Sequence, residues 1–114
     1  MTDDRGYLSD IRECIDRIEA YTRDGRDAFM ASTLIQDGVV RNFEVIGEAA
    51  KRLTPALTQS RSEIPWRRVA GFRDILIHQY RGIDLHAVWN VVERELPDLK
   101  GAVAALLAQL DAQP

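Results

Sequence analysis

The chain has 114 residues, of which 46% are hydrophobic and 29% are charged, and its formal net charge at pH 7 is −3. This length predicts one domain, residues 1–114, with a modest core that a partner subunit would help to stabilise. The composition is typical of a soluble globular protein, and no apolar run approaches the length of a membrane span. The acidic N-terminus is not followed by the apolar segment of a secretory signal. We therefore expect a cytoplasmic protein.

The negative net charge argues against a surface coated with cations for nucleic acid, because such binding depends on lysine and arginine displacing counterions. The charge is nevertheless uneven along the chain. The segment 61–81 is cationic, and its charged residues are Arg61, Glu63, Arg67, Arg68, Arg73, Asp74 and Arg81. This excess of arginine indicates either a phosphate-binding patch or simply a solvated helix face.

Hydrophobic residues recur at three- and four-residue steps along most of the chain, which predicts helices and no strand. The first helix should cover residues 4–21 and end at the polar turn 24–27. The second should begin near residue 32 and continue to residue 53, before a proline breaks it. Gly38 and Gly47 lie inside this second helix, where a glycine costs about 1 kcal/mol relative to alanine. Close helix packing is the expected compensation.

The second half of the chain also reads as helical. Residues 54–63 are rich in Thr, Ser and Gln, which predicts a connection with at most one helical turn. A helix should restart at Pro65 and stop near Gly82, and Asp84 should cap a further helix. Pro97 is expected to interrupt that helix before a last one begins. These elements predict an all-α, up-and-down bundle of four to five helices.

The segment 73–80 reads Arg-Asp-Ile-Leu-Ile-His-Gln-Tyr. It therefore places a cation, an imidazole and a phenol next to three aliphatic residues. Arg73 can bind a phosphate through two hydrogen bonds. His78 can give or take a proton near neutral pH, and Tyr80 offers a hydroxyl that could be modified. Together these residues suggest phosphate chemistry, although a histidine near a helix end can equally be a structural, hydrogen-bonded residue.

Helix geometry constrains how this motif could work. On an unbroken helix, Arg73 and His78 lie about 7.5 Å apart along the axis and about 140° apart around it. Either the helix ends or distorts at residues 77–78, so that His78 and Tyr80 turn back, or a second protomer completes the site across a two-fold axis. Cleavage of RNA without metal needs a base and an acid, and each chain offers one suitable histidine. Two chains would supply both.

Other chemistry-bearing residues are expected to be structural. The only cysteine, Cys14, has no Cys or His neighbours at metal-ligand spacing and is predicted to lie in the core. Glu48 is expected to pair with Arg52 at i,i+4 rather than to bind a metal. His86 follows the Asp84 cap, where an exposed histidine is unremarkable. The sequence contains no phosphate-cradling glycine-rich loop, and we predict neither a metal nor a cofactor.

The segment 73–80 matches the R-x-x-x-x-H-x-Y signature of HepT-like toxins, a branch of the HEPN superfamily of small helical ribonucleases. Residues 41–51, which read RNFEVIGEAAK, resemble the second-helix pattern of the same family. Residues 64–67 (IPWR) and 82–89 (GIDLHAVW) resemble the flanks of its motif. The resemblance covers most of the chain and implies a HEPN-like helical fold.

The resemblance also implies an activity, namely a metal-independent endoribonuclease toxin that acts on tRNA or mRNA as a homodimer whose motifs meet at the interface. Arg73 and His78 match the family's catalytic pair, and Asp74 occupies a position where the family favours a polar residue. Tyr80 matches the tyrosine to which a minimal nucleotidyltransferase antitoxin transfers AMP, which blocks the site. The candidate RNA-binding residues beside the motif are Arg67, Arg68 and Arg81.

A second function class remains open at this point. The chain could be a binding module without turnover, serving as the obligate partner and AMP acceptor of a minimal nucleotidyltransferase. In that interpretation Arg73 and His78 would hold the incoming phosphate. Growth arrest on induction of the chain alone, absent in a His78→Ala variant, would separate the two classes.

Overall fold

Helices make up nearly all of the regular structure in the computed structural model, which describes residues 3–78 and 82–112 apart from the side chains of residues 77 and 78. The elements are α1 (Asp4–Tyr21), α2 (Arg26–Ala31), α3 (Thr33–Lys51), α4 (Pro55–Gln59), α5 (Trp66–His78), α6 (Leu85–Asn90), the π-helical segment η1 (Val91–Glu95) and α7 (Leu96–Asp111). No strand occurs within these described ranges, and the predicted all-α fold is confirmed.

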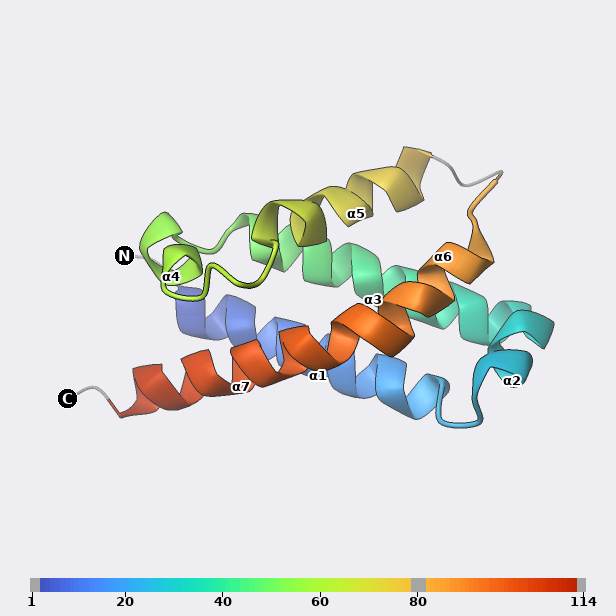
Figure 1. The fold of residues 1–114 in the computed structure, drawn as a ribbon, viewed down its shortest axis with the longest axis horizontal. Helices are drawn as coiled ribbons and strands as arrows, with labels where there is room; N and C mark the ends of the chain where they lie inside the picture. Colours follow the sequence, from blue (N-terminus) through green and yellow to red (C-terminus); the bar gives the residue numbers. More distant parts are fainter. Residues whose placement is uncertain (1–2, 79–81, 113–114) are drawn as a thin grey trace.

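The long helices run up and down in an elongated bundle with dimensions of 48 × 27 × 22 Å (Figure 1). Helix α3 is central, because it packs extensively against α5 and against α1, while α1 also packs against α7. The start of α1 and the end of α7 lie at the same end of the bundle, where Arg5 and Asp111 form an ion pair at 2.8 Å. None of the described helices has the length and apolarity needed to cross a membrane.

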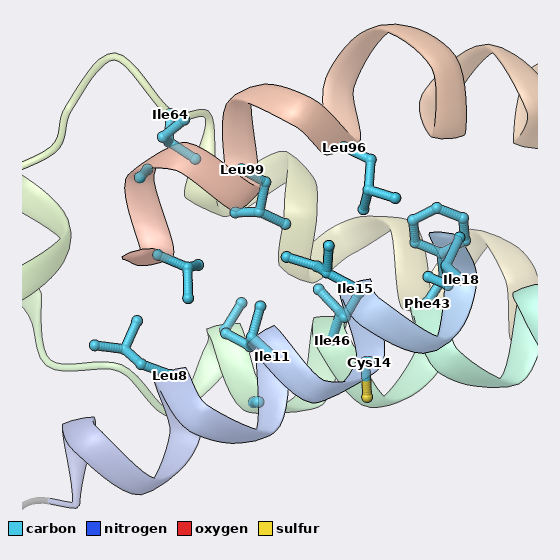
Figure 2. Close-up of a cluster of buried hydrophobic side chains, with 14 of the residues drawn as sticks. Leu8, Ile11, Cys14, Ile15, Ile18, Phe43, Ile46, Ile64, Leu96 and Leu99 are labelled. Carbon is cyan, nitrogen blue, oxygen red and sulfur yellow. The ribbon is translucent and has the colours of Figure 1, made fainter. Parts of the chain in front are cut away.

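The core is built from the apolar stripes of α1, α3 and α7. Five residues of α1 are almost completely inaccessible to solvent: Leu8, Ile11, Cys14, Ile15 and Ile18. Figure 2 shows this stripe facing Phe43 and Ile46 of α3 and Leu96 and Leu99 of α7. Each such side chain contributes about 1.5–3 kcal/mol when it is fully buried. The predicted core position of Cys14 is confirmed, and burial raises the pKa of its thiol.

Helix starts follow the capping signals of the sequence. Asp3 accepts a hydrogen bond from the backbone N–H of Gly6 at 3.1 Å, so α1 begins where it was predicted to begin. The hydroxyl of Ser32 accepts from the N–H of Ile35 at 3.2 Å at the start of α3. The carboxylate of Asp84 accepts from two backbone N–H groups in the first turn of α6, as predicted.

Helix α2 was not predicted. Gly25 precedes it with a φ of 93°, a left-handed value that favours glycine, and this turn starts a six-residue helix before Ser32. The helix packs against α3 and α6. Nη2 of Arg26 lies 2.9 Å from Nδ1 of His86, so the structure places this histidine in a contact between α2 and α6.

The prediction for Pro97 is confirmed in part, because α7 begins at Leu96 with Pro97 in its first turn, but the π-helical segment η1 and not a break leads into it. Proline lacks the N–H of an α-helical hydrogen bond, and its ring collides with the carbonyl four residues earlier. The preceding segment η1 relieves this conflict by widening into a π-helix, in which the N–H of Leu96 bonds to the carbonyl of Val91. The path from α6 through η1 to α7 is therefore continuous.

The closest approach between α3 and α5 occurs at Gly47. A Cβ atom built at this residue would lie 2.6 Å from Cβ of Arg73 and 3.3 Å from the carbonyl oxygen of Ala70. Only a hydrogen fits at that distance, so the close packing predicted for this glycine is confirmed. A Cβ at Gly38 would meet only the ring of Tyr21, at 3.1 Å. Gly47 therefore fixes the position of the Arg73 backbone against α3.

We expect Gly47→Ala to lower the free energy of unfolding by about 1–3 kcal/mol, because overpacking would force α5 away from α3. The matched control is Gly101→Ala in α7, where a new Cβ meets no described atom within 4 Å. That variant should gain up to about 1 kcal/mol from the better helix propensity of alanine. Urea unfolding followed by circular dichroism measures both. Equal stabilisation of the two variants would contradict the tight α3–α5 contact.

Candidate active site

Residues 73–78 of the motif lie on α5, which is helical without a break through His78. The backbones of Arg73 and His78 are therefore about 7.5 Å apart along the helix axis and about 140° apart around it. No distortion of α5 brings the two positions onto one face. Tyr80 and Arg81 lie outside the described residues, as does the side chain of His78, so the alternative in which the chain turns back after His78 is not tested.

Arg73 is held in place by two carboxylates. Its side chain is 32% exposed, its Nε lies 3.4 Å from Oε2 of Glu48, and its Nη1 lies 3.4 Å from Oδ1 of Asp74. A guanidinium carries several N–H donors in a planar fork, so these two contacts leave donors for a phosphate. The structure thus presents an oriented arginine with remaining binding capacity.

Glu48 links Arg73 to a second arginine. Its Oε1 accepts hydrogen bonds from Nη2 of Arg52 at 2.9 Å and from Nε of Arg52 at 3.2 Å. This confirms the i,i+4 pair predicted from the sequence. The hydrogen bond from Arg52 has the largest effect and lowers the pKa of the Glu48 carboxyl; burial opposes it, and the positive charge of Arg73 adds a smaller lowering. Sequence reasoning missed the contact with Arg73, because that contact joins two helices.

A polar cleft of about 270 Å³ opens beside Arg73 between α1, α3 and α5. Its charged lining residues are Asp10, Arg41, Glu44, Glu48, Arg52 and Arg73. Positive and negative groups are therefore interleaved in the polar cleft, and Glu44 lies 3.9 Å from Arg41. Within the described part of the chain, no three His, Cys, Asp or Glu side chains gather as a metal ion would require.

The cationic surface around the motif is smaller than the sequence indicated. Arg61 pairs with Glu63 at 3.2 Å, and Arg68 forms an ion pair with Glu95 of η1. Arg67 is exposed and makes no ion pair with any described residue. Glu48 and Glu95 come from distant parts of the sequence, so a count restricted to residues 61–81 overestimated the local positive charge.

An apolar groove lies on another side of α5, where this helix stands apart from η1 and α7. It has a volume of about 550 Å³, and its apolar lining residues include Phe43, Ile46, Val69, Phe72, Ile75 and Leu99. Ile75 at the groove is 52% exposed, which is unusual for a large aliphatic residue in a small protein. The apolar groove is thus a part of the core that the described residues leave open to solvent.

The outward face of α5 forms a further surface. Positions 67, 71, 74 and 78 follow each other at helical spacing and form what we term the outer stripe. Arg67 and Asp74 are exposed, and a Cβ built at Gly71 would meet no described atom within 4 Å. A glycine in a helix costs about 1 kcal/mol, and no contact within the described chain compensates for this one.

Sequence comparisons with known proteins show to which family the chain belongs. The sequence matches the family model described as ribonuclease HepT-like over residues 11–106. A "Gamma-glutamylcyclotransferase and putative RNase" of Methanocaldococcus jannaschii is 42% identical over 106 residues, which are 92% of this chain and 48% of that protein. The chain thus spans about half the length of that relative. The "Probable ribonuclease HepT" of Thermococcus cleftensis is 41% identical over 98 residues, 85% of this chain and 89% of that protein.

No solved structure matches the chain. The family model nevertheless covers residues 41–51 of α3 and the motif at residues 73–80, which are segments whose resemblance was noted in the sequence. The chain belongs to the ribonuclease HepT-like family.

Proposed function

We propose that the protein is a metal-independent endoribonuclease, the toxin of a type VII-like toxin–antitoxin pair, which cleaves tRNA or mRNA in the cytoplasm. The observation that carries this proposal is Arg73, an oriented arginine with unused donors within the R-x-x-x-x-H-x-Y motif of a ribonuclease HepT-like chain. The names of the relatives, which include ribonuclease HepT, support RNA as the substrate.

The proposed reaction uses two histidines. His78 of one chain removes the proton from a 2′-hydroxyl, and that oxygen attacks the adjacent phosphorus. The bond from phosphorus to the 5′-oxygen breaks, and His78 of the other chain protonates this leaving oxygen. The products are a 2′,3′-cyclic phosphate and a 5′-hydroxyl. Arg73 stabilises the negative charge that gathers on the phosphate oxygens, next to Asp74. The flanking RNA backbone would meet Arg67, Arg68 and Arg81.

We expect Arg73→Ala and His78→Ala each to lower the rate of RNA cleavage by about 10²-fold or more, because each removes a transition-state contact. The helical circular dichroism signal should remain nearly unchanged. His86→Ala is the control, since His86 contacts Arg26 of α2 and is not part of the motif, and this variant should cut normally. A gel assay of RNA cleavage measures the activity of all three variants. Loss of wild-type activity in EDTA, with recovery when a divalent ion is added, would refute the metal-free mechanism.

A homodimer would unite the two histidines. The outer stripe contains position 78 together with Gly71, the glycine that no contact within the described chain explains. If α5 packs against α5 of a second copy along this stripe, Gly71 permits a close approach of the backbones and the two positions 78 meet at the interface. The apolar groove and the exposed Ile75 lie beside the stripe on the same helix and would be covered in part.

We expect Gly71→Arg to convert the dimer into a monomer, because a long charged side chain would stand between the two copies of α5. Gly101→Arg is the matched control, since it changes another helical glycine whose Cβ position is open. Light scattering should give the mass of a dimer for the wild type and for the control, and the mass of a monomer for Gly71→Arg. A fully active wild-type monomer would exclude the composite site.

The proposed regulation is AMP transfer to Tyr80. The phenol oxygen would attack the α-phosphorus of ATP on the nucleotidyltransferase antitoxin, and pyrophosphate would leave. The resulting phosphodiester places a negative charge next to Arg81 in the sequence and near the motif cations that would otherwise hold RNA phosphate. The modification would therefore close the site without unfolding the chain.

We expect Tyr80→Phe to cut RNA like the wild type but to resist neutralisation by the nucleotidyltransferase, because the ring remains while the acceptor oxygen is lost. Tyr21→Phe, at the last residue of α1, is the control and should still be neutralised. Mass spectrometry of the intact chain with and without the transferase would detect added AMP. Neutralisation of the Tyr80→Phe chain without tight binding would show that Tyr80 is not the acceptor.

The alternative proposal is a partner of the nucleotidyltransferase without turnover of its own. The same contacts support it, because an arginine oriented by Glu48 and Asp74 can hold the phosphodiester of a modified tyrosine as well as that of RNA. The two proposals differ in the effect of the chain alone. Growth arrest by the isolated chain that disappears in His78→Ala favours the ribonuclease, and harmless induction of the wild type favours the partner.

A further inference from the structure

We propose that Glu48 is a positioning residue for the proposed ribonuclease site, and that it fixes the guanidinium of Arg73 in the orientation that stabilises the charge gathering on the phosphate oxygens in the transition state. This inference rests on the proposed function, because the role is defined by the reaction that Arg73 supports. Glu48 does not itself touch the substrate. It acts from α3 on a side chain of α5, across the contact that Gly47 makes possible.

The two oxygens of Glu48 have different partners. Arg52 donates two hydrogen bonds to Oε1, at 2.9 and 3.2 Å, which anchors the carboxylate on its own helix. Oε2 is thereby directed away from Arg52, and it lies 3.4 Å from Nε of Arg73. The shortest contact is made by Nε, and a guanidinium carries five N–H donors, so the fork keeps donors for a phosphate.

Arg73 needs such a restraint, because its side chain is long and would otherwise sample many rotamers. Asp74 contacts Nη1, but it follows Arg73 directly on the same helix and is itself 62% exposed on its side chain. Asp74 therefore moves with α5 and cannot tie Arg73 to the rest of the fold. Glu48 is the carboxylate among the described residues that joins Arg73 to a different helix.

Two other roles for Glu48 fit the structure less well. A mainly stabilising role is weak, because the side chains of Glu48 and Arg52 are 39% and 56% exposed and exposed ion pairs contribute little to folding. A role as general base is also disfavoured, because hydrogen bonds from Arg52 and the charge of Arg73 lower the pKa of Glu48 and make its carboxylate a poor proton acceptor at neutral pH. The role that fits Glu48 best is therefore that of a fixed negative charge beside Arg73.

The test compares Glu48→Gln with Glu13→Gln. Both replace a charged carboxylate by an amide of similar shape, and both glutamates form an exposed i,i+4 pair with an arginine, since Glu13 lies 2.7 Å from Nη2 of Arg17. Glu13 is on α1 and makes no contact with Arg73 among the described residues. A general effect of losing one surface ion pair would therefore appear in both variants, whereas a positioning effect would appear only in Glu48→Gln.

The first readout is independent of catalysis. The exchange of the Arg73 Nε–H with water, measured by nuclear magnetic resonance and assigned with Arg73→Lys, should be several-fold faster in Glu48→Gln than in the wild type. It should be unchanged in Glu13→Gln. Equal exchange in the wild type and in Glu48→Gln would overturn the proposal, because the carboxylate would then not restrain the guanidinium.

The second readout is the cleavage of RNA. A misplaced catalytic group costs about 10- to 100-fold, so kcat of Glu48→Gln should fall by at least tenfold while KM changes by less than about twofold. Glu48→Asp keeps the charge at a shorter reach and should give an intermediate kcat. Unchanged kinetics of Glu48→Gln in an active wild-type background would overturn the positioning role alone. A wild-type chain that cleaves no RNA would overturn the proposed function, and the positioning role with it.

Discussion

The close approach of α3 and α5 at Gly47 is the constraint on which the rest of the site depends. Because Gly47 has no Cβ, the backbone of α5 can lie near enough for the Cβ of Arg73 to occupy the space that a side chain would take. Glu48, the next residue along α3, can then reach the guanidinium of Arg73. Packing between two helices therefore decides where a cation of the motif is held, before any substrate is considered.

Stability and orientation come from different interactions in this protein. The buried apolar side chains of α1, α3 and α7 supply the free energy of folding, since each contributes more than an exposed ion pair does. The polar contacts around Arg73 are partly exposed and contribute little to that sum. Their effect is geometric, because they select one arrangement of a flexible side chain on a scaffold that the core already holds rigid.

The sequence predicted most of the fold, because local signals decide most of its elements. The bounds of α1 and the caps at Ser32 and Asp84 follow from hydrophobic periodicity and side-chain hydrogen bonds within one turn. The short helix α2 was missed, since its few residues carry no periodic signal. The continuous path through Pro97 was also missed, because a π-helical turn depends on how α6 and α7 pack and not on the proline itself.

The site was harder to predict than the fold. The motif made Arg73 and Asp74 candidate site residues, which remains a prediction, and the spacing of Glu48 and Arg52 correctly predicted their pair. The contacts of Glu48 with Arg73 and of Glu95 with Arg68 join residues that are far apart in the sequence, and no local pattern contains them. The local sequence around the motif therefore shows which arginines are present. Only the tertiary structure shows which of them form ion pairs with carboxylates from other helices.

Helix α5 has different surroundings on three of its sides. One side is fixed to α3 and carries Arg73, a second borders the apolar groove, and the outer stripe faces away from the chain. Gly71 on that stripe weakens the helix without any compensating contact among the described residues, which is costly for a domain of this size. Arg73 and position 78 are about 140° apart around the helix, so no single chain can aim both at one phosphate while α5 stays straight. A second α5 packed at Gly71 would answer the first difficulty and would bring the two positions 78 together, because the glycine that weakens each helix alone is also what lets two of them come close.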